Sequence, residues 1–146
     1  MIEIRPADTQ DAAAIQELLR QLGYDSTVQE VSDRIAGLVG SDHDPVVVAT
    51  DAGAILGVIA LHWTPMLFSA LPVARITTLV VSDATRGRGV GRILVEAGAE
   101  LARNAGCGTL EVTTALRRSD AQAFYRALGF ASSSMRLHRD LLSTLR

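Results

Sequence analysis

Three glycines alternate with other residues in the segment Arg86-Gly87-Arg88-Gly89-Val90-Gly91, which is followed by Arg92. Glycines let a backbone approach a ligand closely, and the unpaired N–H groups at the start of a helix bind phosphate oxygens. Guanidinium groups add positive charge and paired donors for the same oxygens. The segment therefore predicts a pyrophosphate site that is held largely by the backbone.

Two other nucleotide-binding interpretations are excluded by the same residues. The dinucleotide fingerprint G-x-G-x-x-G is not matched, because the three glycines fall on every second position. All 14 basic residues are arginine, so the sequence has neither the lysine of a P-loop nor a lysine for Schiff-base chemistry.

Apolar patterns predict the elements that must position this segment. It lies between a β-branched run that ends at Val81 and a helical stripe that closes at Gly106. The order β-α-α-β-β-β-α-β-α-β predicts an α/β fold with a mixed central β-sheet flanked by helices. Predicted strands cover residues 2–5, 46–49, 55–61, 74–81, 109–114 and 135–138, and predicted helices cover 10–22, 28–38, 89–104 and 120–128.

Three local signals refine this order. Thr27 and Glu30 have capping-box spacing at the start of the second helix. The tripeptide Asp51-Ala52-Gly53 predicts a hairpin turn. Residues 65–72 form a connection that is too apolar for a solvated loop, so we expect it either to cover a ligand or partner or to fold over the core.

The chain of 146 residues has the size of one domain, and 48% hydrophobic residues suffice for one core. We therefore predict a single domain over residues 1–146. No apolar run approaches the ~20 residues that span a bilayer, and the first residues lack a secretory pattern, so we expect a cytoplasmic protein without a membrane partner. The single Cys107 excludes an internal disulfide, and no His, Cys and carboxylate cluster predicts a metal site.

The net charge of −2 conceals an uneven distribution. Residues 1–74 hold ten acids and three arginines, a net charge of −7, whereas residues 75–146 hold six acids and eleven arginines, a net charge of +5. This division suggests an anionic ligand for the second half and a cationic one for the first, and the alternative is solvated faces. Aromatic residues make up only 4%, which argues against a nucleic-acid partner.

Two segments resemble the GNAT superfamily of acyl-CoA-dependent N-acyltransferases. Arg86, Gly89 and Gly91 match the family's pyrophosphate loop, Arg/Gln-x-x-Gly-x-Gly/Ala after a strand. Residues 121–130, AQAFYRALGF, are similar to the family's helix ending Ala-x-x-(apolar)-Tyr-x-x-x-Gly-Phe. The predicted element order also fits, so the resemblance covers nearly the whole chain and implies a GNAT fold.

The resemblance implies acetyl-CoA as co-substrate, and the residues themselves predict no metal beside it. The main chain of Leu79, Val80 and Val81 would pair with the pantetheine arm and direct an N–H at the acetyl carbonyl. Tyr125 would be the general acid for the CoA thiolate, because a phenol with a pKa near ~10 stays protonated at neutral pH. The pyrophosphate would be bound by Arg86, Gly87, Arg88, Gly89, Val90, Gly91 and Arg92.

The family's usual carboxylate base is missing. Thr77 and Thr113 stand at two strand positions where many relatives carry glutamate, and Arg118 stands where they often carry asparagine. His62, at the end of a predicted strand, and Glu111, with the strand parity of Thr113, are candidate bases acting through water. For both, the alternative is a structural or surface role, in which case the rate would follow the ionisation of the amine itself.

We therefore predict an N-acetyltransferase that moves the acetyl group of acetyl-CoA to a primary amine by direct attack, with a small cationic amine as acceptor. Cys107 is not expected to carry the acetyl group, because it lies at the far end of the helix from the glycine segment. The alternative is a non-catalytic acyl-CoA-binding or regulatory module of the same fold. A homodimer is compatible with either function.

Overall fold

The computed structural model describes residues 1–114 and 119–142, and the chain divides into two compact units, Met1–Val112 and Thr113–Arg146. Among its described residues, 113–114 and 119–142, the second unit contains one helix, α4 (Ser119–Ala127). The first unit contains, in order, β1 (Glu3–Pro6), the 3-10 turn η1 (Thr9–Asp11), α1 (Ala12–Gln21), α2 (Val28–Leu38), β2 (Val46–Asp51), β3 (Ala54–Thr64), β4 (Val73–Val81), the 3-10 turn η2 (Asp83–Thr85), α3 (Val90–Asn104) and β5 (Thr109–Val112).

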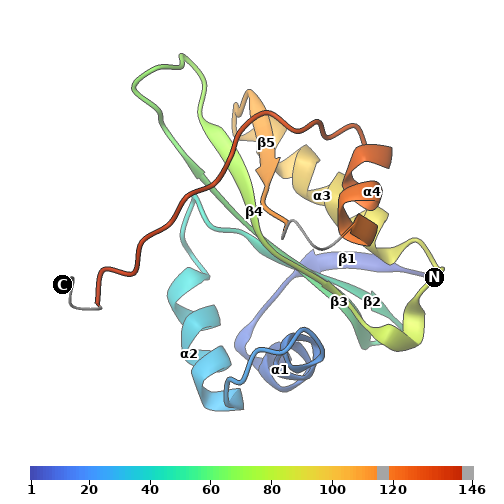
Figure 1. The fold of residues 1–146 in the computed structure, drawn as a ribbon. Helices are drawn as coiled ribbons and strands as arrows, with labels where there is room; N and C mark the ends of the chain where they lie inside the picture. The colour runs from blue at the N-terminus through green and yellow to red at the C-terminus, as the bar shows by residue number, and fades with distance from the viewer. Residues whose placement is uncertain (115–118, 143–146) are drawn as a thin grey trace. The chain divides into compact units, whose positions relative to one another are not determined.

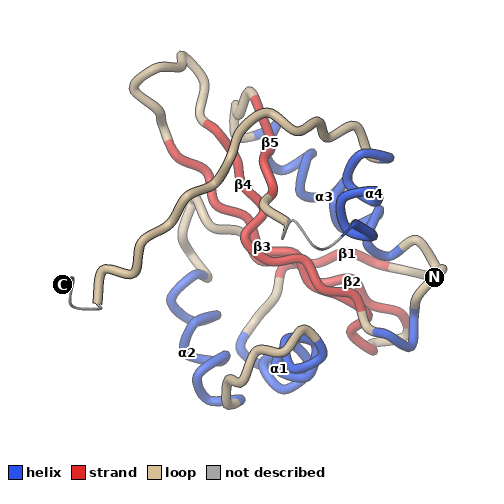
Figure 2. Tube along the Cα trace, in the orientation of Figure 1, coloured by secondary structure: helices blue, strands red, loops and turns tan. Residues whose placement is uncertain are grey.

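The five strands form one sheet in the order β1-β2-β3-β4-β5 (Figure 2). The first three pairings are antiparallel, whereas β4 and β5 are parallel, as expected for strands joined by a crossover helix, here α3. The β2–β3 connection is the predicted hairpin turn, in which Ala52 and Gly53 have φ angles of 51° and 83°. The predicted α/β class with a mixed central sheet is confirmed.

Helices cover both faces of the sheet in the first unit (Figure 1). On one face, α3 lies very close to β3, since a Cβ at Gly98 would be 3.1 Å from Cδ2 of Leu61 and one at Gly57 would be 2.9 Å from Cδ1 of Leu94. The absence of side chains at both glycines allows this approach. On the other face, α1 and α2 share one buried cluster with the strands, which contains Ile15, Leu18, Val31, Ile35, Val48, Val58 and Val80.

Capping boxes start the helical segments of the N-terminal half. The predicted one is confirmed: the Glu30 N–H donates to Oγ1 of Thr27 at 3.0 Å, and the Thr27 N–H donates to the Glu30 carboxylate at 2.9 Å. A second box joins Asp8 and Asp11 at η1. Because this turn precedes α1, the predicted helix over 10–22 begins as a 3-10 turn and becomes α-helical at Ala12.

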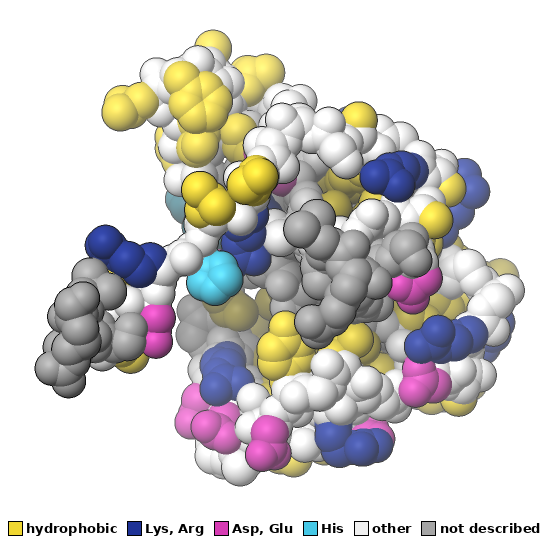
Figure 3. Space-filling view, in the orientation of Figure 1, with side chains coloured by type: hydrophobic (Ala, Val, Ile, Leu, Met, Phe, Trp, Pro, Cys, Tyr) yellow, Lys and Arg dark blue, Asp and Glu magenta, His cyan; other side chains and the backbone are white. Residues whose placement is uncertain are grey.

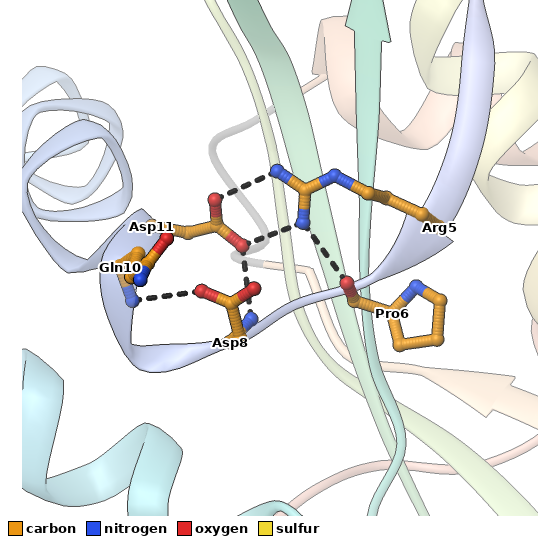
Figure 4. Close-up of polar contacts among 5 residues, drawn as sticks. All are labelled: Arg5, Pro6, Asp8, Gln10 and Asp11. Carbon is orange, nitrogen blue, oxygen red and sulfur yellow. Dashed lines mark hydrogen bonds and ion pairs between the residues drawn. The ribbon is translucent and has the colours of Figure 1, made fainter. Parts of the chain in front are cut away.

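A buried carboxylate ties β1 to this helical segment (Figure 4). Both oxygens of Asp11 accept hydrogen bonds of 2.8 Å from the Arg5 guanidinium, and one also accepts the Asp8 N–H at 2.9 Å. Asp11 is only 6% exposed. Its donors compensate for the loss of hydration, and the hydrogen bond from Arg5 is the main reason that the pKa of Asp11 lies below its ordinary value.

The second unit ends its helix with a left-handed glycine. Gly129 has a φ of +95°, and the Phe130 N–H returns to the carbonyl of Tyr125 at 3.1 Å. Helices commonly end in this way, because glycine adopts positive φ without strain. The Gly-Phe pair of the sequence motif thus has a structural role in closing α4.

The predicted strand over 135–138 is wrong, and the described part of the chain contains five strands in place of the six expected. Residues 131–140 form neither helix nor strand. Met135 and Leu137 are 82% and 84% exposed, so their alternation with polar residues does not mark a buried face. Four alternating residues do not make a strand without a neighbour that pairs with them. The strand predicted over 109–114 also ends earlier, at Val112.

The apolar connection between β3 and β4 is not folded over the core at its tip. Leu67 and Phe68 are among its exposed side chains, and hydrophobic groups protrude over this connection in Figure 3. Closer to β4, Leu71 packs against Gly108, where a Cβ would lie 3.1 Å from the leucine side chain. No helix in the described residues is long and apolar enough to cross a membrane.

Candidate functional site

β4 separates from β5 halfway along its length. Parallel pairing joins residues 73–76 of β4 to residues 109–112 of β5. In the described part of the chain, no strand continues this pairing beside residues 77–81, which include the predicted contacts Leu79, Val80 and Val81. An open strand edge presents backbone N–H and C=O groups that suit an extended ligand.

A β-bulge marks the place where this open edge begins. On the β3 side, Ala60 pairs with Thr78 and Leu61 pairs with Ile76, so Thr77 has no partner of its own. Its hydroxyl donates to the carbonyl of Ala60 at 3.2 Å. Bulges bend a strand and re-aim its groups, and they are common beside active sites.

The glycine segment lies between η2 and the first turn of α3. Gly87 and Gly89 have φ angles of 85° and 76°, a conformation that favours glycine. A Cβ at either position would meet no atom within 4 Å, so conformation and not crowding requires glycine there. Gly89 is the N-cap of α3 and offers no side chain to the first N–H groups of the helix. These features fit a pyrophosphate.

Two of the three arginines predicted to surround the phosphates are engaged in ion pairs. Arg86 lies 2.9 Å from Asp83, and Arg88 lies 2.7 Å from Asp51, while Arg92 is exposed on the first turn of α3. The hydrogen bond from Arg88 is the main cause of the lowered pKa of Asp51. The positive potential of the loop is therefore partly compensated, which leaves more of the binding to backbone groups. Val90 is buried, so only its backbone can contribute.

The predicted general acid, Tyr125, lies in the second unit. Its ring packs edge-on against Phe124 and Phe130, with centroids 5.1 and 5.4 Å away. The ring is half-buried. Arg118, which stands where relatives often carry asparagine, lies outside the described residues.

The two candidate bases lie on the same face of the sheet. His62 of β3 is opposite Arg75 of β4, and Arg75 is opposite Glu111 of β5, and residues in direct opposition share a face. The imidazole has a partner that sequence reasoning missed, since its Nδ1 lies 2.6 Å from Oδ1 of Asp44. Arg75 was also missed. Both are found by strand register, which no motif reveals.

The described residues supply neither a reactive thiol nor a metal site. Burial raises the pKa of the Cys107 thiol, which disfavours the reactive thiolate. The thiol follows the C-terminal end of the 15-residue α3, about 22 Å from its N-terminus. Among residues 1–114 and 119–142, no group of three or more His, Cys, Asp and Glu side chains could hold a metal ion.

Comparisons with known proteins agree with this geometry. The model of the acetyltransferase (GNAT) family matches residues 12–130. An aminoalkylphosphonate N-acetyltransferase from Salmonella typhimurium is 30% identical over 95% of this chain and 91% of its own. A solved putative acetyltransferase from Agrobacterium tumefaciens is 29% identical, with a TM-score of 0.86 over 94% of this chain and 99% of that chain.

An aminoglycoside N-acetyltransferase solved in complex with CoA has the same fold. It is 19% identical, with a TM-score of 0.86 over 98% of this chain and 96% of that chain. The family match covers β2 to β5, the open edge and the glycine segment together. The chain therefore belongs to the GNAT acetyltransferase family and is an acetyl-CoA-dependent acyltransferase.

Proposed function

We propose that this protein transfers the acetyl group of acetyl-CoA to the primary amine of a small cationic molecule, by direct attack of the amine on the thioester. The observation that carries the proposal is the continuity of the open edge at residues 77–81 with the glycine segment at the start of α3. An extended edge suits the pantetheine arm, and a helix N-terminus suits the pyrophosphate.

Each residue in the proposed site has a separate task. An N–H of β4 near Leu79 would donate to the acetyl oxygen and stabilise the charge that develops there. Tyr125 would protonate the sulfur as the carbon–sulfur bond breaks and the carbon–nitrogen bond forms. The amine must attack in its neutral form, so a group such as His62 or Glu111 would take the proton of its ammonium. The raised pKa of Cys107 supports direct attack over an acyl-enzyme.

The acceptor class rests on two kinds of support. The relative from Salmonella is named for acetylating aminoalkylphosphonates, which are small amines. Residues 1–74, with a net charge of −7, favour a cationic acceptor. The N-acetyltransferase relatives favour an enzyme over the acyl-CoA-binding module considered as the alternative. A cytoplasmic location, the absence of nucleic-acid partners and a homodimer stay predictions.

The decisive experiment measures free thiol released from acetyl-CoA in the presence of a panel of amines. The panel contains diamines and polyamines, amino acids, aminoalkylphosphonates, aminoglycosides and peptides with free N-termini. We expect release that depends on the amine and is strongest with small cationic members. CoA binding in calorimetry without thiol release from any amine would contradict the proposal and favour the binding module.

A further inference from the structure

Four ionisable residues form a row across one face of the sheet. His62, Arg75 and Glu111 occupy opposed positions on β3, β4 and β5. The segment before β2 extends the row, because the Trp63 N–H donates to the carbonyl of His43 and the Leu61 N–H donates to the carbonyl of Pro45, each at 3.0 Å. These two bonds place residue 44 directly opposite His62 in a non-hydrogen-bonded pair, where side chains are closest.

The Asp44 carboxylate at the end of this row is held on both oxygens. Oδ2 accepts a 2.7 Å hydrogen bond from the Ser41 hydroxyl, and Oδ1 lies 2.6 Å from Nδ1 of His62. The Ser41 hydrogen bond and then the imidazole lower the pKa of this carboxyl, so it is ionised at neutral pH. An ionised carboxylate only accepts hydrogen bonds, and therefore the shared proton belongs to Nδ1.

The row thus contains an imidazole with a fixed orientation. With the proton on Nδ1, the lone pair of Nε2 points away from Asp44, and the side chain of His62 is 49% exposed. Glu111 is different, because in the described part of the chain no hydrogen bond or ion pair holds its carboxylate. A base must be both oriented and accessible, and of the two candidates His62 meets both conditions.

We propose that Asp44 and His62 act as a dyad that takes the proton of the acceptor ammonium, with Asp44 as the positioning residue. This inference rests on the proposed acetyltransferase function. In it, the dyad takes the role of the strand glutamate that this sequence lacks. The ammonium loses one proton through intervening water to Nε2 of His62, and the imidazolium passes it to solvent. The neutral amine then attacks, and the second proton lost by nitrogen balances the one that the departing thiolate gains.

The first test follows kcat/KM against pH for two acceptors whose amines differ in basicity. The charged groups that face His62 are Asp44 and Arg75, with Glu111 one strand further, and the titratable His43 precedes Asp44 in the loop. We expect wild-type rates to reach a plateau below the pKa of either amine, about 100-fold loss at pH 7 in His62→Gln, and about 10-fold loss at pH 7 in Asp44→Asn. In His62→Gln, the pH dependence of kcat/KM should instead follow the ionisation of each amine.

Matched controls come from the same loop. Asp42→Asn and His43→Gln change the same residue types in the loop, and both should keep the wild-type profile. Glu111→Gln tests the competing base and is not a control: it should keep the shape of the wild-type pH dependence, although losing its charge should lower kcat/KM for a cationic acceptor. A profile lost in Glu111→Gln and kept in His62→Gln would overturn the dyad while leaving the acetyltransferase intact, whereas a wild-type protein that acetylates no amine would overturn both.

A second test needs no turnover. Nitrogen-15 NMR of the neutral imidazole distinguishes a proton on Nδ1 from a proton on Nε2, and we expect His62 to carry it on Nδ1. In Asp44→Ala, this preference should be lost while CoA affinity stays unchanged. A His62 ring that is protonated on Nε2 in the wild-type protein would overturn the orienting role of Asp44.

Discussion

The replacement Tyr125→Phe removes one oxygen and keeps the ring that packs against Phe124 and Phe130. If the hydroxyl protonates the departing thiolate, single-turnover thiol release should fall about 100-fold, because a positioned general acid contributes at least that much. CoA affinity measured by calorimetry should stay constant, since the change acts on the transition state and not on binding. Wild-type turnover in the variant, with chemistry limiting the rate, would assign the acid role to another group.

Single residues also mark the limit of sequence reasoning about this site. His62 and Glu111 were recognisable as candidate bases, but the partner of His62 was not. Counting back from the hairpin turn at residues 52–53 would place Asp44 opposite Leu61, on the wrong face. A β-bulge between Ala49 and Thr50 shifts the register by one residue and brings Asp44 to His62. The sequence marks this bulge only by Gly57 inside an apolar run, and a strand glycine equally fits the close approach of α3 that the structure shows there.

At the scale of elements, the glycine segment allows conformation and charge to be tested separately. Gly89 has a φ of +76° and open space around its missing Cβ, so Gly89→Ala should cost about 1 kcal/mol of stability from backbone strain and retain CoA binding. Gly89→Glu has the same backbone strain and adds a negative charge where the pyrophosphate is expected. Calorimetry should show CoA binding lost in the glutamate variant, and similar CoA affinities in both variants would refute the loop assignment.

The junction of β1 with η1 makes a prediction about stability and pH. Asp11→Asn removes the charge that both Arg5 nitrogens contact, so the free energy of unfolding at pH 7 should fall by roughly 2 kcal/mol. The pKa of Asp11 lies below its ordinary value of 3.8, so its ionisation stabilises the fold fully above that value. The stabilisation is lost as pH falls through the lowered pKa.

Urea unfolding of wild type and Asp11→Asn across this pH range checks the prediction. The difference between the two proteins should be constant from pH 7 down to about 5 and should shrink below about 4. Glu96→Gln, at an exposed position of α3 with no hydrogen bond or ion pair among the described residues, is the control and should match wild type. A difference that persists unchanged at pH 3 would mean that the Arg5 contact does not depend on the charge of Asp11.

The predicted elements succeeded where local patterns were strong. The Thr27–Glu30 capping box, the 52–53 turn and the long apolar strands each carry several agreeing signals, and the structure confirms them. The strand over 135–138 rested on alternation alone and does not form. The end of β5 at Val112 could not be predicted from the sequence either, because the end of a strand depends on the strand that pairs with it. That early end also opens the edge of β4.

At the scale of the whole molecule, ion pairs modify the charge division that the sequence shows. Acidic and basic side chains are interspersed over α1 and α2 in Figure 3, where Glu17 pairs with Arg20 and Glu30 lies near Arg34. The Asp51–Arg88 pair even joins the acidic half to the basic half. The two pairs within residues 1–74 use arginines that the net charge of −7 already counts, so of these three pairs only Asp51–Arg88 offsets that charge. The acceptor preference should therefore depend on the row that contains His62 as well as on the overall field.

This row contains two carboxylates, Asp44 and Glu111, against one guanidinium, Arg75. We therefore expect kcat/KM to be higher for a diamine than for an aminoalkylphosphonate of similar length, and to fall for the diamine as salt is raised, because screening weakens attraction between exposed charges. Glu111→Gln should reduce this preference, since it removes one attracting charge. If the aminoalkylphosphonate is faster, and Arg75→Gln abolishes its advantage, then the row selects the anionic end of the acceptor and the cationic assignment is wrong.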